Sequence, residues 1–348
     1  MTKQIAVFDG HNDVLLRLYR STSSDPVKDF LDGEAAGHID LQKAKAGSLA
    51  GGLFALYSPS TAKPRPPGTQ PSPTLPPPMS MDEARHSVIG ELAILLKVER
   101  ASKGAVSRCR TVAEIKSAIA RGSLAVVVHI EGCDAIDADL NFLEVLYAAG
   151  LRSLGPVWSR NNIFGHGVPF RFPSSPDIGD GLTEAGENLV RVCNEMKILI
   201  DLSHITEKGF WDVARLSKAP LIATHSNAHV LCPSPRNLTD KQLDAIRDSG
   251  GLAGLNFATG FLRPDGAMRP DTDIEIMVRH LDYLIDKLGE DHVGLGSDFD
   301  GATIPEKIGS AAGLPVLIDA LRGKGYSEPL LTKLGTDNWL NVLERTIG

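Results

Sequence analysis

The stretch IAVFDGHND, residues 5–13, runs from a short apolar segment directly into two side chains that can bind metal ions, His11 and Asp13. A metal-capable side chain follows an apolar run at four further places, namely Glu131 after LAVVVHI, His204 after ILIDLS, His225 after PLIAT and Asp298 after HVGLGS. Side chains at the carboxyl ends of barrel strands meet at one mouth. The pattern therefore predicts strands that deliver ligands to one shared point.

Short aliphatic or β-branched runs bounded by glycine or polar residues are typical of buried strands. We assign such runs to residues 4–8, 51–57, 124–130, 151–157, 198–203, 220–224, 252–257 and 292–297. Helical segments fall between them, and Ser80 with Glu83 fits the capping box that opens one of these helices. Eight strands separated by helices predict a (β/α)8 TIM barrel. The alternative, an open doubly wound sheet, lacks its phosphate-binding Gly-x-Gly-x-x-Gly turn here, where the first turn reads DGHND.

The composition excludes several classes of partner. The chain has 348 residues, of which 42% are hydrophobic, and 36 basic against 43 acidic residues give a net charge of −7. No basic run is long enough to follow a phosphate backbone, so we expect no nucleic-acid partner. The chain reaches Asp9 and His11 too soon for a signal-peptide core, and no stretch approaches the roughly 20 apolar residues of a membrane helix. Four widely spaced cysteines without a Cys-x-x-Cys pair favour free thiols, and we expect a cytoplasmic protein without a membrane partner.

We expect a single domain over residues 1–348, with a proline-rich insertion at about 58–79. That insertion, SPSTAKPRPPGTQPSPTLPPPM, follows the second predicted strand. Its prolines fix φ and lack amide donors, so it predicts an extended surface excursion, either a lid or docking arm or a disordered insertion. The segment GHGVPFRFPSSPDIGDG, residues 165–181, predicts a second long loop on the same face.

The residue types at the strand ends suit a metal centre. Imidazoles and carboxylates together are typical ligands of a borderline cation such as zinc. One ion would not use all of them, whereas two ions about 3.5–4 Å apart could share a bridging carboxylate, for which Glu131 is the candidate. His11 and Asp13 lie two residues apart on one extended segment and point to the same side, so they could hold one ion. His204 and His225, from neighbouring strands, could hold the other.

These residues resemble the membrane (renal) dipeptidase family of metallopeptidases, peptidase family M19, whose members are dizinc (β/α)8-barrel hydrolases that cleave dipeptides. The resemblance covers nearly the whole chain. It is carried in family order by DGHND (9–13), IEG (130–132), DLSH (201–204), THSNA (224–228), Arg236 with Asn237, and GSDFDG (296–301).

The resemblance implies two zinc ions, bridged by Glu131 and a water or hydroxide. His11 and Asp13 would bind one zinc, and His204 and His225 the other. Arg236 matches the arginine that holds the substrate's terminal carboxylate, and Asp298 matches the aspartate that shuttles the proton. The fold is then a barrel of the metal-dependent hydrolase type, and the resemblance suggests a homodimer. The implied reaction is hydrolysis of dipeptides, including those with a D-residue at the C-terminal side, by a hydroxide that forms near neutral pH.

One position departs from the family pattern. Where the family often has a histidine that stabilises the oxyanion, this chain has Trp158 in LGPVWSRNNIFGHG. Tryptophan offers a donor N–H and a broad apolar face but no imidazolium, so it is a candidate for substrate binding. Asn161, Asn162 and His166 are candidates to replace the missing histidine.

Two other functions stay open from the sequence. A barrel amidohydrolase acting on another small amide or a lactone is the first, but such enzymes usually begin with His-x-His and bridge their metals through a carbamylated lysine, whereas this chain has HND and Glu131. A metal-stabilised binding protein or pseudoenzyme is the second. Several polar residues favour structural roles instead, with His129 in the core and Asp9 and His38 in loop hydrogen bonds.

Overall fold

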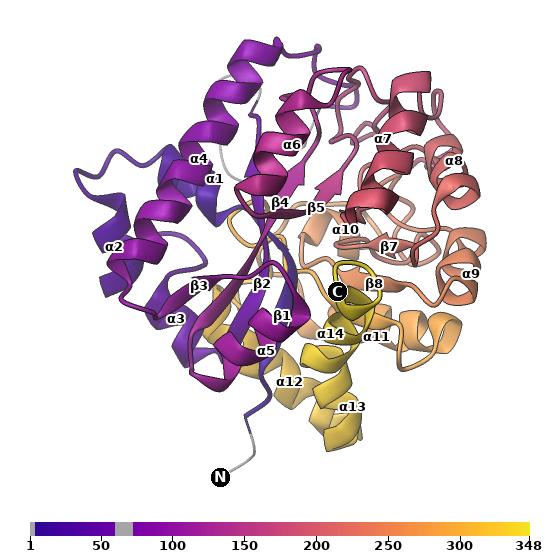
Figure 1. The fold of residues 1–348 in the computed structure, drawn as a ribbon. Coiled ribbons are helices and arrows are strands. Elements are labelled where there is room, and N and C mark those ends of the chain that lie inside the picture. The colour runs from indigo at the N-terminus through magenta and orange to yellow at the C-terminus, as the bar shows by residue number, and fades with distance from the viewer. Residues whose placement is uncertain (1–3, 60–71) are drawn as a thin grey trace.

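The computed structural model describes residues 4–59 and 72–348, and its strands form one parallel sheet (Figure 1). Eight of them are hydrogen-bonded in the order β6-β5-β4-β2-β1-β9-β8-β7. The strands are β1 (Val7–Asn12), β2 (Leu49–Tyr57), β3 (Val106–Arg108), β4 (Leu124–Glu131), β5 (Leu151–Gly155), β6 (Leu199–Ile200), β7 (Ile222–Ala223), β8 (Leu252–Leu255) and β9 (Val293–Leu295). The two ends of the order meet where Leu202 N donates to Ile222 O at 2.8 Å, which joins β6 to β7. The (β/α)8 barrel predicted from the sequence is confirmed.

Helices surround the strands on the outside of the barrel (Figure 1). They are α1 (Val14–Tyr19), α2 (Pro26–Asp32), α3 (Leu41–Ala46), α4 (Met81–Ala101), α5 (Val112–Ala120), α6 (Asn141–Ala148), α7 (Glu184–Met196), α8 (Glu207–Leu216), α9 (Asp240–Asp248), α10 (Thr259–Leu262), α11 (Ile274–Leu288), α12 (Leu314–Gly323), α13 (Glu328–Thr332) and α14 (Asn338–Glu344), with a 3-10 turn at Ala311–Gly313 and a π-helical turn at Lys333–Asp337. The capping box predicted at Ser80 and Glu83 opens α4.

All eight predicted strands have a counterpart, but two of them are much shorter than predicted. β6 and β7 have only two residues each, because the carboxylate of Asp201 takes backbone donors that a longer ladder would use. Asp201 Oδ1 accepts from Ser203 N at 2.9 Å and from Thr224 N at 2.8 Å. The sequence pattern also missed β3, whose three residues pair only with the first part of β4.

The barrel is closed from the end opposite the predicted ligands by Trp339 of α14, which is fully buried. Its indole Nε1 donates to Leu295 O at 2.9 Å. Glycines in the facing strands make room for the ring: a Cβ at Gly10 would lie 2.4 Å from the indole, and one at Gly294 would lie 2.5 Å from it. The absence of side chains at these positions therefore lets the tryptophan enter between the strands.

The structure describes one of the two predicted loops completely. Residues 60–71, most of the proline-rich insertion expected at 58–79, lie outside the described residues. The loop at 165–181 is described and connects β5 to α7 without a helix or a regular strand. It contributes Phe170 and Phe172 to a cavity at the barrel mouth, so this loop does lie on the face with the predicted ligands.

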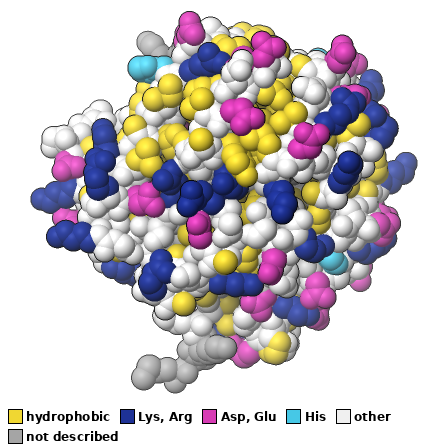
Figure 2. Space-filling view, in the orientation of Figure 1, with side chains coloured by type: hydrophobic (Ala, Val, Ile, Leu, Met, Phe, Trp, Pro, Cys, Tyr) yellow, Lys and Arg dark blue, Asp and Glu magenta, His cyan; other side chains and the backbone are white. Residues whose placement is uncertain are grey.

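Charges of both signs alternate over the face of the molecule in Figure 2, without a continuous basic surface there. Within residues 4–59 and 72–348, every helix is too short or too polar to cross a membrane.

The contacts of Trp339 predict a large effect of its removal. We expect Trp339→Ala to lower the free energy of unfolding by about 3–5 kcal/mol, because it leaves a cavity among close-packed strands. Urea unfolding followed by circular dichroism measures the change. Trp211→Ala is the matched control, since Trp211 is 38% exposed and its truncation should change the unfolding free energy by only about 0.5 kcal/mol. Equal effects of the two substitutions would contradict the role of Trp339 in closing the barrel.

Candidate metal centre and active site

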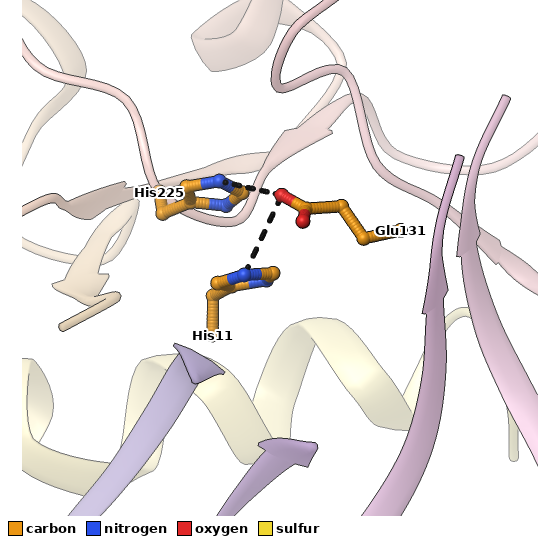
Figure 3. Close-up of side chains that lie close together, drawn as sticks. All are labelled: His11, Glu131 and His225. Carbon is orange, nitrogen blue, oxygen red and sulfur yellow. Dashed lines mark ion pairs between the residues drawn. The ribbon is translucent and has the colours of Figure 1, made fainter. Parts of the chain in front are cut away.

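Three histidines from distant parts of the chain converge on one carboxylate oxygen. Figure 3 shows two of them, His11 and His225, beside Glu131. Glu131 Oε1, at the end of β4, lies 3.0 Å from His204 Nε2, 3.3 Å from His225 Nε2 and 3.5 Å from His11 Nε2. All four side chains are buried. The structure therefore places three of the other four predicted metal ligands around Glu131, the predicted bridge.

The two remaining acidic residues lie on the His11 side of the cluster. Asp13 Oδ2 is 3.4 Å from His11 Nε2, although Asp13 lies just beyond β1, at the N-cap of α1, and not on an extended strand as predicted. Ligand atoms of His11, Asp13 and Asp298 all lie within 4.8 Å of one another. Asp298 has a left-handed backbone with φ of 59°, and its Oδ2 accepts from Asn256 Nδ2 at 2.9 Å. Asn256 thus fixes the orientation of the Asp298 carboxylate.

A second set of hydrogen bonds orients two of the imidazoles. Ser159 Oγ is 2.8 Å from His204 Nδ1, and Thr224 Oγ1 is 2.7 Å from His225 Nδ1. The Thr224 hydroxyl in turn donates to Asp201 Oδ2 at 2.6 Å. Hydroxyl acceptors at Nδ1 favour the tautomer in which Nδ1 carries the hydrogen and Nε2 keeps a free lone pair. Both lone pairs then face Glu131.

The electrostatics of the cluster push neighbouring groups in opposite directions. Burial lowers the pKa of His204 and His225 well below the ordinary value, and neighbouring positive charges add to this shift. Burial alone would also lower the pKa of His11, but the charges of Glu131 and Asp13 outweigh it and raise that pKa. Burial raises the pKa of Glu131. Such opposed shifts within one buried cluster are typical of functional sites.

The donor set fits metal ions. Nitrogen and oxygen ligands at about 2.0–2.1 Å from a tetrahedral ion lie about 3.3–3.4 Å from one another, close to the separations measured around Glu131. Neither ring nitrogen of His11 has a hydrogen-bond partner among the described residues. An imidazole buried without partners is costly, and coordination of a cation would remove that cost.

The cluster opens into a cavity of about 400 Å³ at the mouth of the barrel. Its walls are mainly aromatic, with Tyr57, Trp158, Phe170, Phe172 and Phe261 among the lining residues. Polar groups lie together at one place in this wall, and they come from Asp13, Glu131, His204 and Asp298. A small apolar cavity with a few convergent polar groups is typical of a site for a small molecule.

Arg236 lies behind the Phe261 side of the cavity, with its guanidinium carbon 5.3 Å from the centre of that ring. The side chain is buried, and it makes only long hydrogen bonds, to His225 O at 3.3 Å and to Ser226 Oγ at 3.4 Å. Its Nε has no partner, and no carboxylate of residues 4–59 or 72–348 forms an ion pair with it. A buried cation without a counter-ion is unfavourable, so this arginine is poised for an anion.

Trp158 forms part of the cavity wall, and its contact with a substrate stays a prediction. Its ring packs edge-on against Tyr57 and Phe170, with centroids 5.2 and 5.5 Å apart, and lies 5.7 Å from the ring of His204. The candidates to replace the family histidine lie elsewhere. Asn161, Asn162 and His166 accept or donate hydrogen bonds within their own loop, and none of them lines this cavity.

The three polar residues for which structural roles were expected form hydrogen bonds within the fold. His129 is buried inside the barrel, where its Nδ1 is 2.8 Å from Ser153 Oγ. Asp9 accepts from the backbone and hydroxyl of Ser297 at 2.7 and 2.8 Å. His38 Nδ1 accepts from Asp300 N at 2.8 Å, which ties the loop before α3 to the turn after β9.

Sequence reasoning missed two polar residues of the site, Asn256 and Tyr57. Both follow or end an apolar run, which is the signal that found the metal ligands. Neither is a typical metal ligand, however, so a search for ligand types passed over them. The hydroxyls of Ser159 and Thr224 gave no signal, because serine and threonine are common at strand ends.

Comparison with known proteins agrees with this geometry. A model of the membrane dipeptidase family, peptidase family M19, matches residues 1–347. The chain is 54% identical to a solved metallo peptidase from Rhodobacter sphaeroides that is liganded with a phosphinate mimic of the dipeptide L-Ala-D-Ala. That match covers 99% of this chain and 100% of the other, with a TM-score of 0.94.

Two further relatives are similar over most of their length. A solved metallo peptidase of family M19, called dipeptidase AC, is 54% identical, with 99% and 100% of the two chains covered and a TM-score of 0.94. A Klebsiella pneumoniae protein, described as an uncharacterized protein in the pqqA 5′ region, is 52% identical over 254 residues, which are 73% of this chain and 94% of its own.

The central place of Glu131 predicts that its charge is required for metal binding. We expect Glu131→Gln to reduce the metal bound per chain by at least half, because a neutral amide is a poor bridge between two cations. Inductively coupled plasma mass spectrometry of the dialysed protein measures the content. Glu187→Gln, on the surface of α7, should bind as much metal as the unaltered protein. Full metal content in Glu131→Gln would refute the bridging role.

Proposed function

The chain belongs to the membrane dipeptidase family, peptidase family M19, and is a metallo-dipeptidase; we propose that it uses two zinc ions to hydrolyse dipeptides, including those with a D-residue at the C-terminal side. The observation that carries the proposal is the position of Glu131 Oε1 within 3.5 Å of three histidine Nε2 atoms, at the wall of a cavity sized for a small ligand. The Rhodobacter sphaeroides relative, with its L-Ala-D-Ala mimic, supports the choice of substrate.

The proposed ligands are His11 and Asp13 for one ion, His204 and His225 for the other, and Glu131 for both. When bound, the two ions would lower the pKa of a water molecule and polarise the scissile carbonyl. The hydroxyls of Ser159 and Thr224 keep His204 and His225 in the tautomer that ligation requires.

Arg236 defines where the substrate ends. Its planar guanidinium matches the geometry of a carboxylate, and a terminal carboxylate would supply the anion that the described residues do not. The aromatic ring of Phe261 covers one side of this position. A carboxylate held there places the peptide bond at a fixed distance from the cluster, which favours substrates of two residues over longer peptides.

Asp298 is the proposed general base and acid. It lies beside His11 and Asp13, and Asn256 holds one of its oxygens. Its carboxylate would accept a proton from the attacking water and return that proton to the leaving amine. Trp158 would contact the substrate through its apolar face as part of the cavity wall.

We further propose one metal-dependent hydrolase domain over residues 1–348, a cytoplasmic location and a homodimer. The family match over residues 1–347 supports the first. The four cysteines are free and buried, which suits a reducing compartment. Exposed apolar side chains such as Ile89 and Val145, 54% and 59% exposed, offer surface for a second copy, and light scattering of the purified protein would measure the mass of the assembly.

A small dipeptide panel tests the activity. We expect zinc-dependent hydrolysis of L-Ala-L-Ala and L-Ala-D-Ala, loss of activity after chelation and recovery when zinc is added back. The C-terminally amidated forms should show a kcat/KM about 10- to 100-fold lower, because they lack the charged partner of Arg236. Chromatographic detection of the free amino acids gives the rates. No metal-dependent cleavage across the panel would refute the proposed reaction.

The role of Asp298 makes a separate prediction. We expect Asp298→Asn to lower kcat by about 10²- to 10⁴-fold, because an amide cannot take up the proton, while both metals are retained. Steady-state kinetics and metal content on the same preparation measure the two effects. Asp282→Asn, on the outer helix α11, is the control and should match the unaltered enzyme. A kcat within about threefold of the unaltered value would rule out Asp298 as the base.

A further inference from the structure

Tyr57 is a polar residue of the cavity that the mechanism above does not use. It ends β2, and its register partner on the neighbouring parallel strand is Glu131. Paired residues of adjacent strands project to the same side of a sheet, so the two side chains extend to the same end of the barrel. Both line the cavity. The edge-on contact with Trp158 fixes the direction of the phenol ring.

A buried cation lies behind the phenol. Arg160 is fully buried and donates from Nε to Asp134 Oδ1 at 3.0 Å and from Nη2 to Ser58 O at 2.8 Å. Its positive charge acts on Tyr57, and its Nη1 has no hydrogen-bond partner among the described residues. A guanidinium has donors only, so the phenol oxygen can accept from Arg160 while its own hydrogen is left for another acceptor.

The hydroxyl of Tyr57 has no acceptor among residues 4–59 and 72–348. A tyrosine hydroxyl ordinarily has a pKa of about 10, so it keeps its hydrogen near neutral pH. A neighbouring cation makes a phenol a stronger donor, and apolar walls strengthen such a hydrogen bond. The pocket thus holds a polarised donor beside the metal cluster, and none of the described residues accepts its hydrogen.

The sheet order decides which part of a substrate this donor would meet. β2 lies four strands from β7 in either direction around the barrel, so Tyr57 faces the cluster from the side opposite to Arg236, which follows β7. A dipeptide whose carboxylate is held by Arg236 would therefore present its scissile bond, and not its carboxylate, to Tyr57.

We propose that Tyr57 is a further catalytic residue, whose hydroxyl donates a hydrogen bond to the oxygen of the scissile carbonyl. This inference rests on the proposed dipeptide hydrolysis. The carbonyl oxygen gains negative charge when water adds to the carbon, and a donor already in place stabilises that charge more than it stabilises the neutral carbonyl. Tyr57 would thus supply the hydrogen-bond donor that is a histidine in many family members and that is missing here, where Trp158 replaces it. Arg160 acts through Tyr57 as a positioning residue.

The test is Tyr57→Phe in the zinc-loaded enzyme, which removes only the hydroxyl. We expect kcat to fall by about 100-fold, with KM within about twofold and the metal content unchanged. The phosphinate mimic of L-Ala-D-Ala, whose tetrahedral phosphorus carries charged oxygens, should bind more weakly by a similar factor, as measured by calorimetry. Binding of the product D-Ala should be unaffected, because its carboxylate lies with Arg236.

Controls separate this role from a structural one. Tyr283→Phe removes a hydroxyl that donates to Asp240 on the outer surface, and it should leave kcat and phosphinate affinity unchanged. A lower metal content or a lower melting temperature of Tyr57→Phe would show a structural role and overturn the proposal. A kcat and a phosphinate affinity within twofold of the unaltered enzyme would also overturn it. If the unaltered enzyme cleaved no dipeptide, the proposed function would fail, whereas the phosphinate affinities would still decide the role of Tyr57.

Discussion

The structure depends on the convergence of three imidazole nitrogens on one oxygen of Glu131. This arrangement places a carboxylate and three histidines in a buried site with neighbouring acidic groups, which is unfavourable unless cations compensate it. Closure of the barrel imposes the arrangement, because the strands that carry these residues cannot separate without breaking the ring of hydrogen bonds. Apolar side chains and Trp339 fill the barrel below the site and stabilise the fold, whereas the candidate functional residues lie at the rim.

The same constraint explains the shortness of β6 and β7. Asp201 accepts the backbone donors that would lengthen these strands, and it also accepts from the Thr224 hydroxyl next to His225. Part of the sheet's regular hydrogen bonding is therefore replaced by side-chain bonds that orient a ligand. Such local departures from regular structure are expected at functional sites, where geometry has to be fixed more closely than a ladder allows.

The two sides of the cavity carry different polar groups. Arg236 lies beyond β7 without a counter-ion among the described residues, and the metal cluster and Tyr57 lie toward β4 and β2. If Arg236 holds the terminal carboxylate as proposed, a short substrate would bind in one direction across this site. The aromatic walls exclude water and strengthen each polar contact, so a few groups suffice for both orientation and chemistry.

The barrel and the candidate site residues, namely the five ligands, Arg236 and Asp298, could be predicted from the sequence, because strand ends and family motifs can be read along the chain. The sequence could not find Tyr57 or Asn256, and it offered Asn161, Asn162 and His166 for a place at the pocket that they do not occupy. The positions of these five residues depend on how a loop folds back and on which strands are neighbours. No local sequence pattern encodes the loop path or the strand order. The position of Glu131 beside all three histidines follows from the three-dimensional fold, since those distances arise from barrel closure, which joins the ends of β6 and β7.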